Sequence, residues 1–240
     1  MDTNNKLTMA TYLVVGGSSG IGLQVVNDLA AQGHRVYATF NSHEITSGHA
    51  NISYHPLNVL DETMQMSFLP ETIDGLVYCP GAISLRPFAR IAAADFVADY
   101  QLQVVGAVKC IQEALPKLKT SEAASIVLFS TVAVQLGLNF HSLVSASKGA
   151  IEGLTKALSA ELAPKIRVNC IAPSLTDTPL AASLLNSEQK LEANAQRHPL
   201  KRVGSTQDIS NMVEFLITPK SGWMTGQVLH VDGGMSAIKL

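Results

Sequence analysis

Residues 14–22, Val-Val-Gly-Gly-Ser-Ser-Gly-Ile-Gly, join the end of an apolar strand to the start of a helical pattern. Glycines in such a turn let backbone N–H groups approach a phosphate closely, and the N-terminus of the helix adds a positive dipole end. The spacing is GxxxGxG, not the GxGxxG of the general dinucleotide fingerprint, and three glycines could equally serve a tight strand-to-helix turn. With a strand before it and a helix after it, we expect a pyrophosphate-binding loop. Its expected contact residues are Gly16, Ser18, Ser19, Gly20, Ile21 and Gly22.

Short apolar runs alternate with helix-length segments along the rest of the chain. The expected strands are residues 12–15, 35–39, 52–55, 75–79, 125–130, 167–172 and 228–231. The expected helices are residues 20–32, 93–115, 143–162 and 205–216. Strands separated by helices form parallel sheets that are covered on both faces. The pattern therefore predicts an α/β fold: a single doubly wound, Rossmann-like domain over residues 1–240, with a parallel sheet of about seven strands and helices on both faces.

The composition argues against several classes of partner. The formal net charge is -2 and no block of like charge occurs, so nucleic acid is not an expected partner. The first ten residues, MDTNNKLTMA, lack the pattern of a signal peptide, and no apolar stretch is long enough to span a membrane. The cysteines, Cys79, Cys110 and Cys170, lie far apart in apolar runs, which favours reduced core residues and a cytoplasmic location, with no metal site.

Several ordered segments resemble the classical short-chain dehydrogenase/reductase family. VVGGSSGIG resembles its TGxxxGxG motif, with Val15 in place of the threonine. HPLNVLD, residues 55–61, resembles the segment whose Asp contacts adenine, here Asn58 beside Val59. IRVNCIAPSLTDTP, residues 166–179, and TGQVLHVDGG, residues 225–234, resemble the family's last two strands. The resemblance covers nearly the whole chain and implies an oxidoreductase that uses NAD or NADP.

The end of the second strand indicates which of the two cofactors is used. It reads Thr39-Phe40-Asn41-Ser42, without the acidic residue that would accept hydrogen bonds from free ribose hydroxyls. Asn41, Ser42 or His43 could donate to a 2′-phosphate, so we expect NADP, with NAD possible; these residues could equally be ordinary polar loop residues. By resemblance, the other residues that contact the cofactor are Cys79, Pro80, Gly81, Lys148, Pro173, Ser174, Thr176 and Thr178.

The catalytic segment departs from the family pattern. Family enzymes carry a Ser, a Tyr thirteen residues later and a Lys four residues after the Tyr, so that Tyr and Lys share one face of a helix. VSASKGA, residues 144–150, resembles YxASKAA, which places Lys148 at the lysine, Val144 at the tyrosine and Thr131 at the serine. The resemblance implies that Lys148 binds the nicotinamide ribose and Thr131 orients the substrate, while the usual phenol is missing.

His141 is the candidate replacement for the acid. It lies three residues before Val144 and seven before Lys148, so all three would share one face if the helix already runs there. A histidine is well suited to general acid catalysis near neutral pH. The alternative is a histidine that faces solvent or a neighbouring subunit. A helix asparagine that helps to relay protons in the family is also replaced, and Gln103 stands at its position. The usual proton relay is therefore in question.

Residues 177–199 form an Ala/Leu-rich insert between Pro179 and Pro199, beside the expected substrate site. We expect this insert to act as an apolar lid. The residues expected to cover the substrate are Leu180, Leu184, Leu185, Leu191 and His198. Tyr100 is expected in the core, the other histidines mostly on the surface, and Ser205 as a helix cap with Asp208 in the first turn.

Two functions remain open at this point. The first is an NADP-dependent oxidoreductase that transfers hydride between NADP(H) and a small carbonyl or imine substrate, with His141 or water as the proton source. The alternative is a catalytically defective NADP-binding pseudoenzyme that acts as a sensor or oligomeric partner. The family resemblance implies a homodimer or homotetramer in either case.

Overall fold

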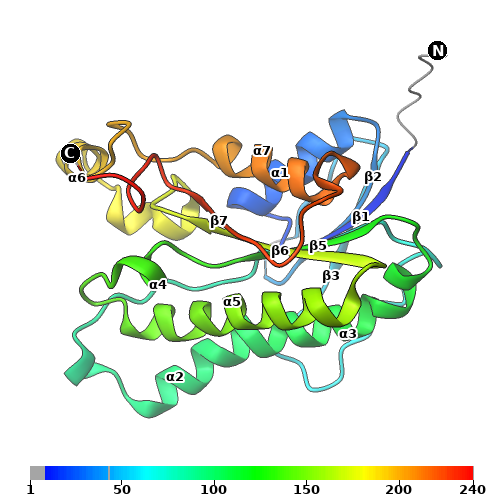
Figure 1. Cartoon of the computed structure of the whole chain (residues 1–240), viewed down its shortest axis with the longest axis horizontal. Coiled ribbons are helices and arrows are strands. Elements are labelled where there is room, and N and C mark those ends of the chain that lie inside the picture. Colours follow the sequence, from blue (N-terminus) through cyan, green and yellow to red (C-terminus); the bar gives the residue numbers. More distant parts are fainter. Residues whose placement is uncertain (1–8, 43, 240) are drawn as a thin grey trace.

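The computed structural model describes residues 9–42 and 44–239, and its centre is a parallel sheet (Figure 1). The strand order is β3-β2-β1-β4-β5-β6-β7. The strands are β1 (Thr11–Val15), β2 (Arg35–Phe40), β3 (Ile52–Pro56), β4 (Gly75–Tyr78), β5 (Ala124–Phe129), β6 (Ile166–Pro173) and β7 (Val228–Val231). The doubly wound prediction is confirmed, and each strand ends within one residue of its expected position. His43 lies outside the described residues.

Helices cover both faces of the sheet because both faces are apolar (Figure 1). Leu13, Leu76 and Ile126 align on neighbouring strands and pack toward α3 (Gly106–Lys119) and α5 (Ser142–Leu162). The next residue along each strand points to the opposite face, where Val14, Val77 and Val127 pack toward α1 (Gly20–Ala31) and α7 (Thr206–Ile217). Full burial of these side chains explains why the strands read as continuous apolar runs.

The segment expected to be helical, residues 93–115, is helical, and the helix continues to Lys119. It is not α-helical throughout, because the chain forms α2 (Ala93–Tyr100), then one π-helical turn (Gln101–Val105), then α3. The Tyr78 hydroxyl donates a 2.6 Å hydrogen bond to the Leu102 carbonyl inside that turn. A Cβ at Gly106 would collide with the same hydroxyl. A buried tyrosine thus packs directly against the irregular turn.

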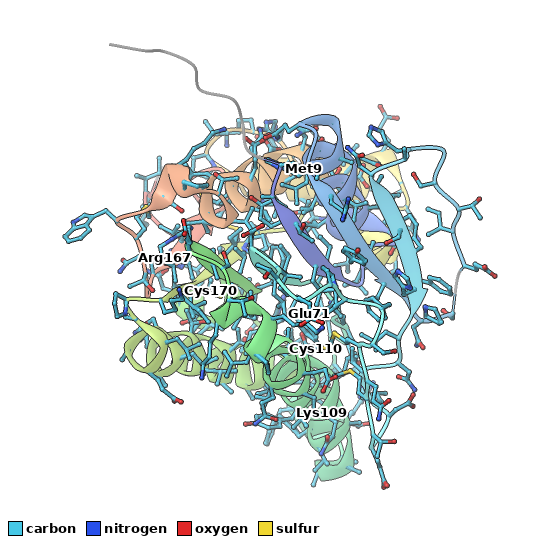
Figure 2. The ribbon with its side chains drawn as sticks, turned by 90° about the vertical axis from the view of Figure 1, so that its right-hand side faces the viewer. Met9, Glu71, Lys109, Cys110, Arg167 and Cys170 are labelled. Carbon is cyan, nitrogen blue, oxygen red and sulfur yellow. The ribbon has the colours of Figure 1, made fainter. Side chains whose placement is uncertain are left out.

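The prediction that Tyr100 lies in the core is wrong. Its side chain is 44% exposed at the end of α2. By contrast, Cys110 of α3 and Cys170 of β6 are buried and unpaired, as expected (Figure 2), while Cys79 is partly exposed and packs against the core. Within residues 9–42 and 44–239, no helix combines the length and apolar character needed to cross a membrane.

The insert between Pro179 and Pro199 is helical, as the sequence predicts. It contains the 3-10 helix η3 (Pro179–Leu184) and the helix α6 (Glu188–Gln196). The remaining short elements are η1 (Phe88–Arg90), α4 (Ala133–Leu136) and η4 (Pro219–Ser221). In Figure 1 the insert lies at the same end of the molecule as α4 and the beginning of α5. We call residues 179–199 the lid.

The predicted cap of α7 is confirmed as a reciprocal capping box. Ser205 Oγ accepts a hydrogen bond from Asp208 N at 3.2 Å, and Ser205 N donates to Asp208 Oδ2 at 2.7 Å. Arg202 also donates to both Asp208 carboxylate oxygens, and this hydrogen bonding lowers the pKa of Asp208 well below its ordinary value.

Replacing this cap is expected to destabilise the fold without altering ligand binding. Ser205→Ala removes the acceptor for the Asp208 amide and is expected to lower the free energy of unfolding by about 1 kcal/mol, measured by urea denaturation. Ser205→Asn, which keeps a side-chain acceptor, is the control and should unfold close to the original. Equal stability of all three proteins would contradict the role of the cap.

Candidate active site

Two adjoining cavities open at the carboxyl ends of the central strands. One, of about 470 Å³, runs along the loops that follow β1, β2, β3 and β4; we call it the nucleotide groove. The other, of about 270 Å³, lies under the lid beside β5, α5 and the end of β6; we call it the inner pocket. Five residues line both: Ile21, Cys79, Gly81, Thr178 and Leu180. In parallel α/β sheets, ligands bind at this edge, where the strand order reverses between β1 and β4.

The glycine loop opens the N-terminus of α1 toward the nucleotide groove. Gly16 adopts a φ of 75°, and its N–H donates to Thr39 Oγ1 at 3.1 Å, which ties the loop to β2. Ser19, at the helix cap, makes no capping hydrogen bond with its side chain, and the first turn holds no acidic residue. The first N–H groups of α1 therefore remain available for an anion.

Apart from His43, which lies outside the described residues, the residues expected to hold the nucleotide part of the cofactor line this groove. They are Gly16, Ser18, Ser19, Gly20, Ile21, Gly22, Asn41, Ser42, Asn58, Val59, Cys79, Pro80, Gly81 and Thr178. Asn58 closes its own loop by accepting from Leu60 N at 3.1 Å and donating to Asp61 at 2.7 Å. Among the described residues that line the groove, none carries a charged side chain, so none of them repels a 2′-phosphate.

Lys148 lies where the two cavities meet. A Cβ built on Gly81 would be 3.8 Å from Lys148 Nζ and 3.4 Å from Gln103 Oε1, so both polar atoms face the space beside this glycine. Burial lowers the pKa of Lys148 to about 8, although the nearby Asp99 carboxylate opposes the shift. An ammonium with this pKa is partly deprotonated in mildly alkaline solution.

Beneath Lys148 is a buried polar network that the sequence did not reveal. The Asp99 carboxylate accepts hydrogen bonds from Gln103 Nε2 at 2.8 Å and from Ser147 Oγ at 2.5 Å. Gln103 Oε1 is buried and accepts no hydrogen bond within the described part of the chain. Buried acceptors in native proteins are normally paired, so this oxygen suits a hydrogen-bond donor of a bound ligand or water. Together with the open α1 terminus, it shows that the site fits a nicotinamide nucleotide.

The inner pocket contains all of the residues expected to act on the substrate. Thr131 follows β5, and its Oγ1 accepts from Ala133 N at 3.3 Å. Val144 is only 6% exposed and also lines the pocket, four residues before Lys148. The loop residues Pro173, Ser174 and Thr176, which the resemblance places against the cofactor, line this pocket and not the nucleotide groove, whereas Thr178 lines both.

His141 also lines the inner pocket, although α5 begins one residue after it. It occupies the N-cap position, where its side chain makes no capping hydrogen bond, and does not lie within the first turn. Its Nδ1 is 2.6 Å from the Asn139 carbonyl oxygen. Because a carbonyl only accepts, Nδ1 carries the hydrogen of this bond, and Nε2 is the nitrogen left for the pocket.

A second histidine was only partly foreseen. His198 is 3% exposed, its Nε2 is 2.8 Å from Ser174 Oγ, and its Nδ1 is 2.8 Å from the Asn194 carbonyl oxygen. His198 lines the inner pocket from the lid, as expected. Most of the histidines were expected at the surface, but His198 and His34 are buried. No spacing in the sequence links residue 198 to residue 174.

The lid supplies a less apolar wall than expected. Leu180 and Leu184 line the inner pocket, whereas Leu185 and Leu191 do not. Arg197, which the sequence reasoning missed, lines it instead. Arg197 is the residue just after α6 and is exposed to solvent as well as lining the pocket, and the Ala/Leu composition of the insert concealed this polar end.

Comparisons with known proteins agree with the geometry. A family model described as enoyl-(acyl carrier protein) reductase matches residues 15–236. A tropinone reductase homolog from Arabidopsis thaliana is 32% identical over 98% of this chain and 96% of its own length. The chain belongs to the short-chain dehydrogenase/reductase family.

Further similarities support the assignment. Senescence-associated protein 13 from the same plant is 33% identical over 93% of this chain and 89% of its own. A short-chain dehydrogenase/reductase structure from Mycobacterium ulcerans has a TM-score of 0.83 at 25% identity, covering 95% of this chain and 90% of that one. The structure of ElxO with NADP bound has a TM-score of 0.85 at 25% identity, covering 96% of this chain and all of that one. These similarities support an NAD(P)-dependent enzyme.

The tight contact behind the glycine loop provides a test of nucleotide binding. A Cβ on Gly22 would collide with the Gly16 carbonyl oxygen, so Gly22→Ala must displace the loop. We expect Gly22→Ala to weaken NADPH binding at least about tenfold, measured by fluorescence titration. Gly153→Ala on α5, where nothing lies within 4 Å of an added Cβ, is the control and should bind normally. Normal binding by Gly22→Ala would place the nucleotide elsewhere.

Proposed function

We propose that this protein transfers hydride between NADP(H) and a small carbonyl or imine substrate. The observation that best supports this proposal is the position of Lys148 beside Gly81. At this point the nucleotide groove, which has an uncharged lining, meets the largely apolar inner pocket. In this arrangement the lysine and the orphaned Gln103 oxygen face a bound nucleotide, while Thr131 and His141 face a substrate.

NADP is the cofactor that the groove suits best. The groove carries no acidic residue at the end of β2, and Asn41 and Ser42 line it there. A carboxylate at this position would repel a 2′-phosphate and favour free hydroxyls. ElxO, whose fold this chain shares over nearly its full length, binds NADP.

The protein's own residues position the reactants. The nicotinamide, when bound, supplies or accepts the hydride, and the protein contributes binding and orientation. The Lys148 ammonium and Gln103 Oε1 hold hydroxyl groups of the nucleotide near Gly81. The Thr131 hydroxyl orients the substrate oxygen or nitrogen, and the apolar side chains Leu180 and Leu184 exclude water from above.

The proton comes from a source other than the family's tyrosine, because Val144 occupies the position four residues before Lys148. His141 is the proposed donor: its imidazolium form keeps the Nδ1 hydrogen on the Asn139 carbonyl and gives the Nε2 proton to the substrate, which leaves the neutral ring. An iminium substrate needs no strong donor after hydride reaches carbon, and this substrate class tolerates Val144.

We also propose a homodimer or homotetramer in the cytoplasm. Large apolar side chains are exposed near α2, among them Phe88 at 72% and Val97 at 60%. Two buried, unpaired cysteines suit a reducing compartment.

Turnover tests the proposal directly. NADPH oxidation is followed at 340 nm with a panel of ketones, aldehydes and cyclic imines. We expect turnover with part of the panel, and a loss of about 10²- to 10⁴-fold in kcat for carbonyl substrates in His141→Ala, because a general acid is removed. Val144→Tyr should retain or raise activity. Tight NADPH binding with no turnover on the whole panel would favour the sensor instead.

The pKa of Lys148 predicts how cofactor binding depends on pH. The ammonium is the form that holds the ribose, and it is lost as the pH rises through about 8. NADPH affinity should therefore be constant at lower pH and decline above that value, by at most about tenfold per pH unit. Lys148→Met should bind weakly at every pH, without this decline. An unchanged slope in Lys148→Met would assign the titration to another group.

Cofactor selectivity gives an independent prediction. Asn41→Asp places a carboxylate in the groove, so we expect the ratio of NADPH to NADH affinity to fall by about tenfold or more, measured by parallel titrations. Asn51→Asp makes the same substitution outside the groove and should leave the ratio unchanged. An unchanged ratio in Asn41→Asp would show that the 2′-phosphate lies elsewhere.

A further inference from the structure

The inner pocket has an unbalanced set of charged and ionisable side chains. Four of the residues that line it are basic or can become so: His141, Lys148, Arg197 and His198. None of its lining residues is Asp or Glu. The other lining side chains are mainly apolar, so a cationic substrate group would find no partner there, whereas an anion would find several.

The basic groups form two sets at different places in the pocket. Lys148 lies beside Gly81, which also lines the nucleotide groove, and belongs to the proposed cofactor site. Arg197 and His198 come from the lid, and neither lines the nucleotide groove. The second set therefore faces the part of a substrate that lies away from the cofactor.

Arg197 is not committed to a partner within the described chain. Its side chain is exposed, it forms no ion pair among those the described residues make, and its hydrogen bond to Asn194 Oδ1 is long, at 3.4 Å. Arg202, five residues later, instead donates to both oxygens of Asp208. A guanidinium without a carboxylate at the edge of an apolar cavity can form a bidentate pair with a planar carboxylate.

The Ser174 and His198 pair is committed to hydrogen bonds within the protein. His198 Nδ1 donates to the Asn194 carbonyl, which fixes the ring so that Nε2 meets Ser174 Oγ. Ser174 Oγ is also 3.2 Å from Met235 Sδ. Arg197 is therefore the cationic group of this wall that has no strong partner of its own among the described residues.

We infer that the substrate is an apolar carbonyl or imine compound that carries a carboxylate away from its reacting carbon. The Arg197 guanidinium binds the carboxylate, and the apolar walls hold the rest of the molecule. This inference rests on the proposed function for the reacting end, while the carboxylate site stands on the lid residue Arg197 alone. A carboxylate suits one guanidinium better than a doubly charged phosphate, which needs more donors.

Measuring how tightly a carboxylate ligand and a neutral analogue bind to the protein, in the presence of saturating NADP⁺, tests the inference without requiring turnover. The probes are 4-acetylbenzoate and 4-acetylbenzamide, which have similar shapes and differ in charge, and calorimetry measures both dissociation constants. We expect the acid to bind at least about tenfold more tightly than the amide, and added salt to reduce this preference. Equal affinities, or no binding of the acid, would overturn the inference.

Variants assign the preference to the lid. Arg197→Gln should remove the preference for the acid, and Arg197→Lys should restore part of it. Lys201→Gln removes a nearby cation that does not line the pocket and should keep the full preference. A preference that survives in Arg197→Gln would also overturn the inference. Comparable melting temperatures of Arg197→Lys and Arg197→Gln establish that a loss is not caused by unfolding.

The two proposals fail in different ways. If 4-acetylbenzoate binds selectively but neither it nor any ketone or imine of the panel is reduced, the carboxylate site stands and hydride transfer is wrong. If neutral ketones are reduced while the acid shows no advantage, hydride transfer stands and the carboxylate site is wrong.

Discussion

Burial of the parallel sheet on both faces is the constraint from which the site follows. Side chains from β1, β4 and β5 alternate between the two helical layers and are fully buried on each side. Parallel strands in one sheet must all end at the same edge, so the loops after them gather there. The glycine loop, the end of β2 and the Pro173 loop are distant in sequence and meet only because of this alignment.

The buried Tyr78 connects this framework to the polar chemistry. Burial raises the pKa of its hydroxyl far above the ordinary value, so the hydroxyl remains a neutral donor to the Leu102 carbonyl. The π-turn that accommodates it contains Gln103, whose amide bonds Asp99 and whose oxygen faces the space near Lys148. A single aromatic side chain under the sheet is thus linked through the π-turn to the segment that carries a polar atom of the site.

Under the proposed function, the inner pocket differs from the family pattern. Val144 contributes an apolar side chain, and the ionisable residues His141, Arg197 and His198 also line the pocket. In this proposal, acid chemistry and substrate recognition depend on residues outside the segment that carries the family's tyrosine and lysine.

The strands and the glycine loop were predictable from the sequence because local apolar runs and glycines mark them, and resemblance to the family located Lys148 and Thr131. The face that His141 presents was not predictable, because α5 begins only after it. The π-helical turn at residue 101 was not predictable either, since it bonds Tyr78, which is more than twenty residues away. The contact between Ser174 and His198 and the place of Arg197 at the pocket were equally hidden. Sequence patterns report which residues share a strand or a helix face, whereas packing of the lid against the sheet edge decides which side chains meet across the pocket.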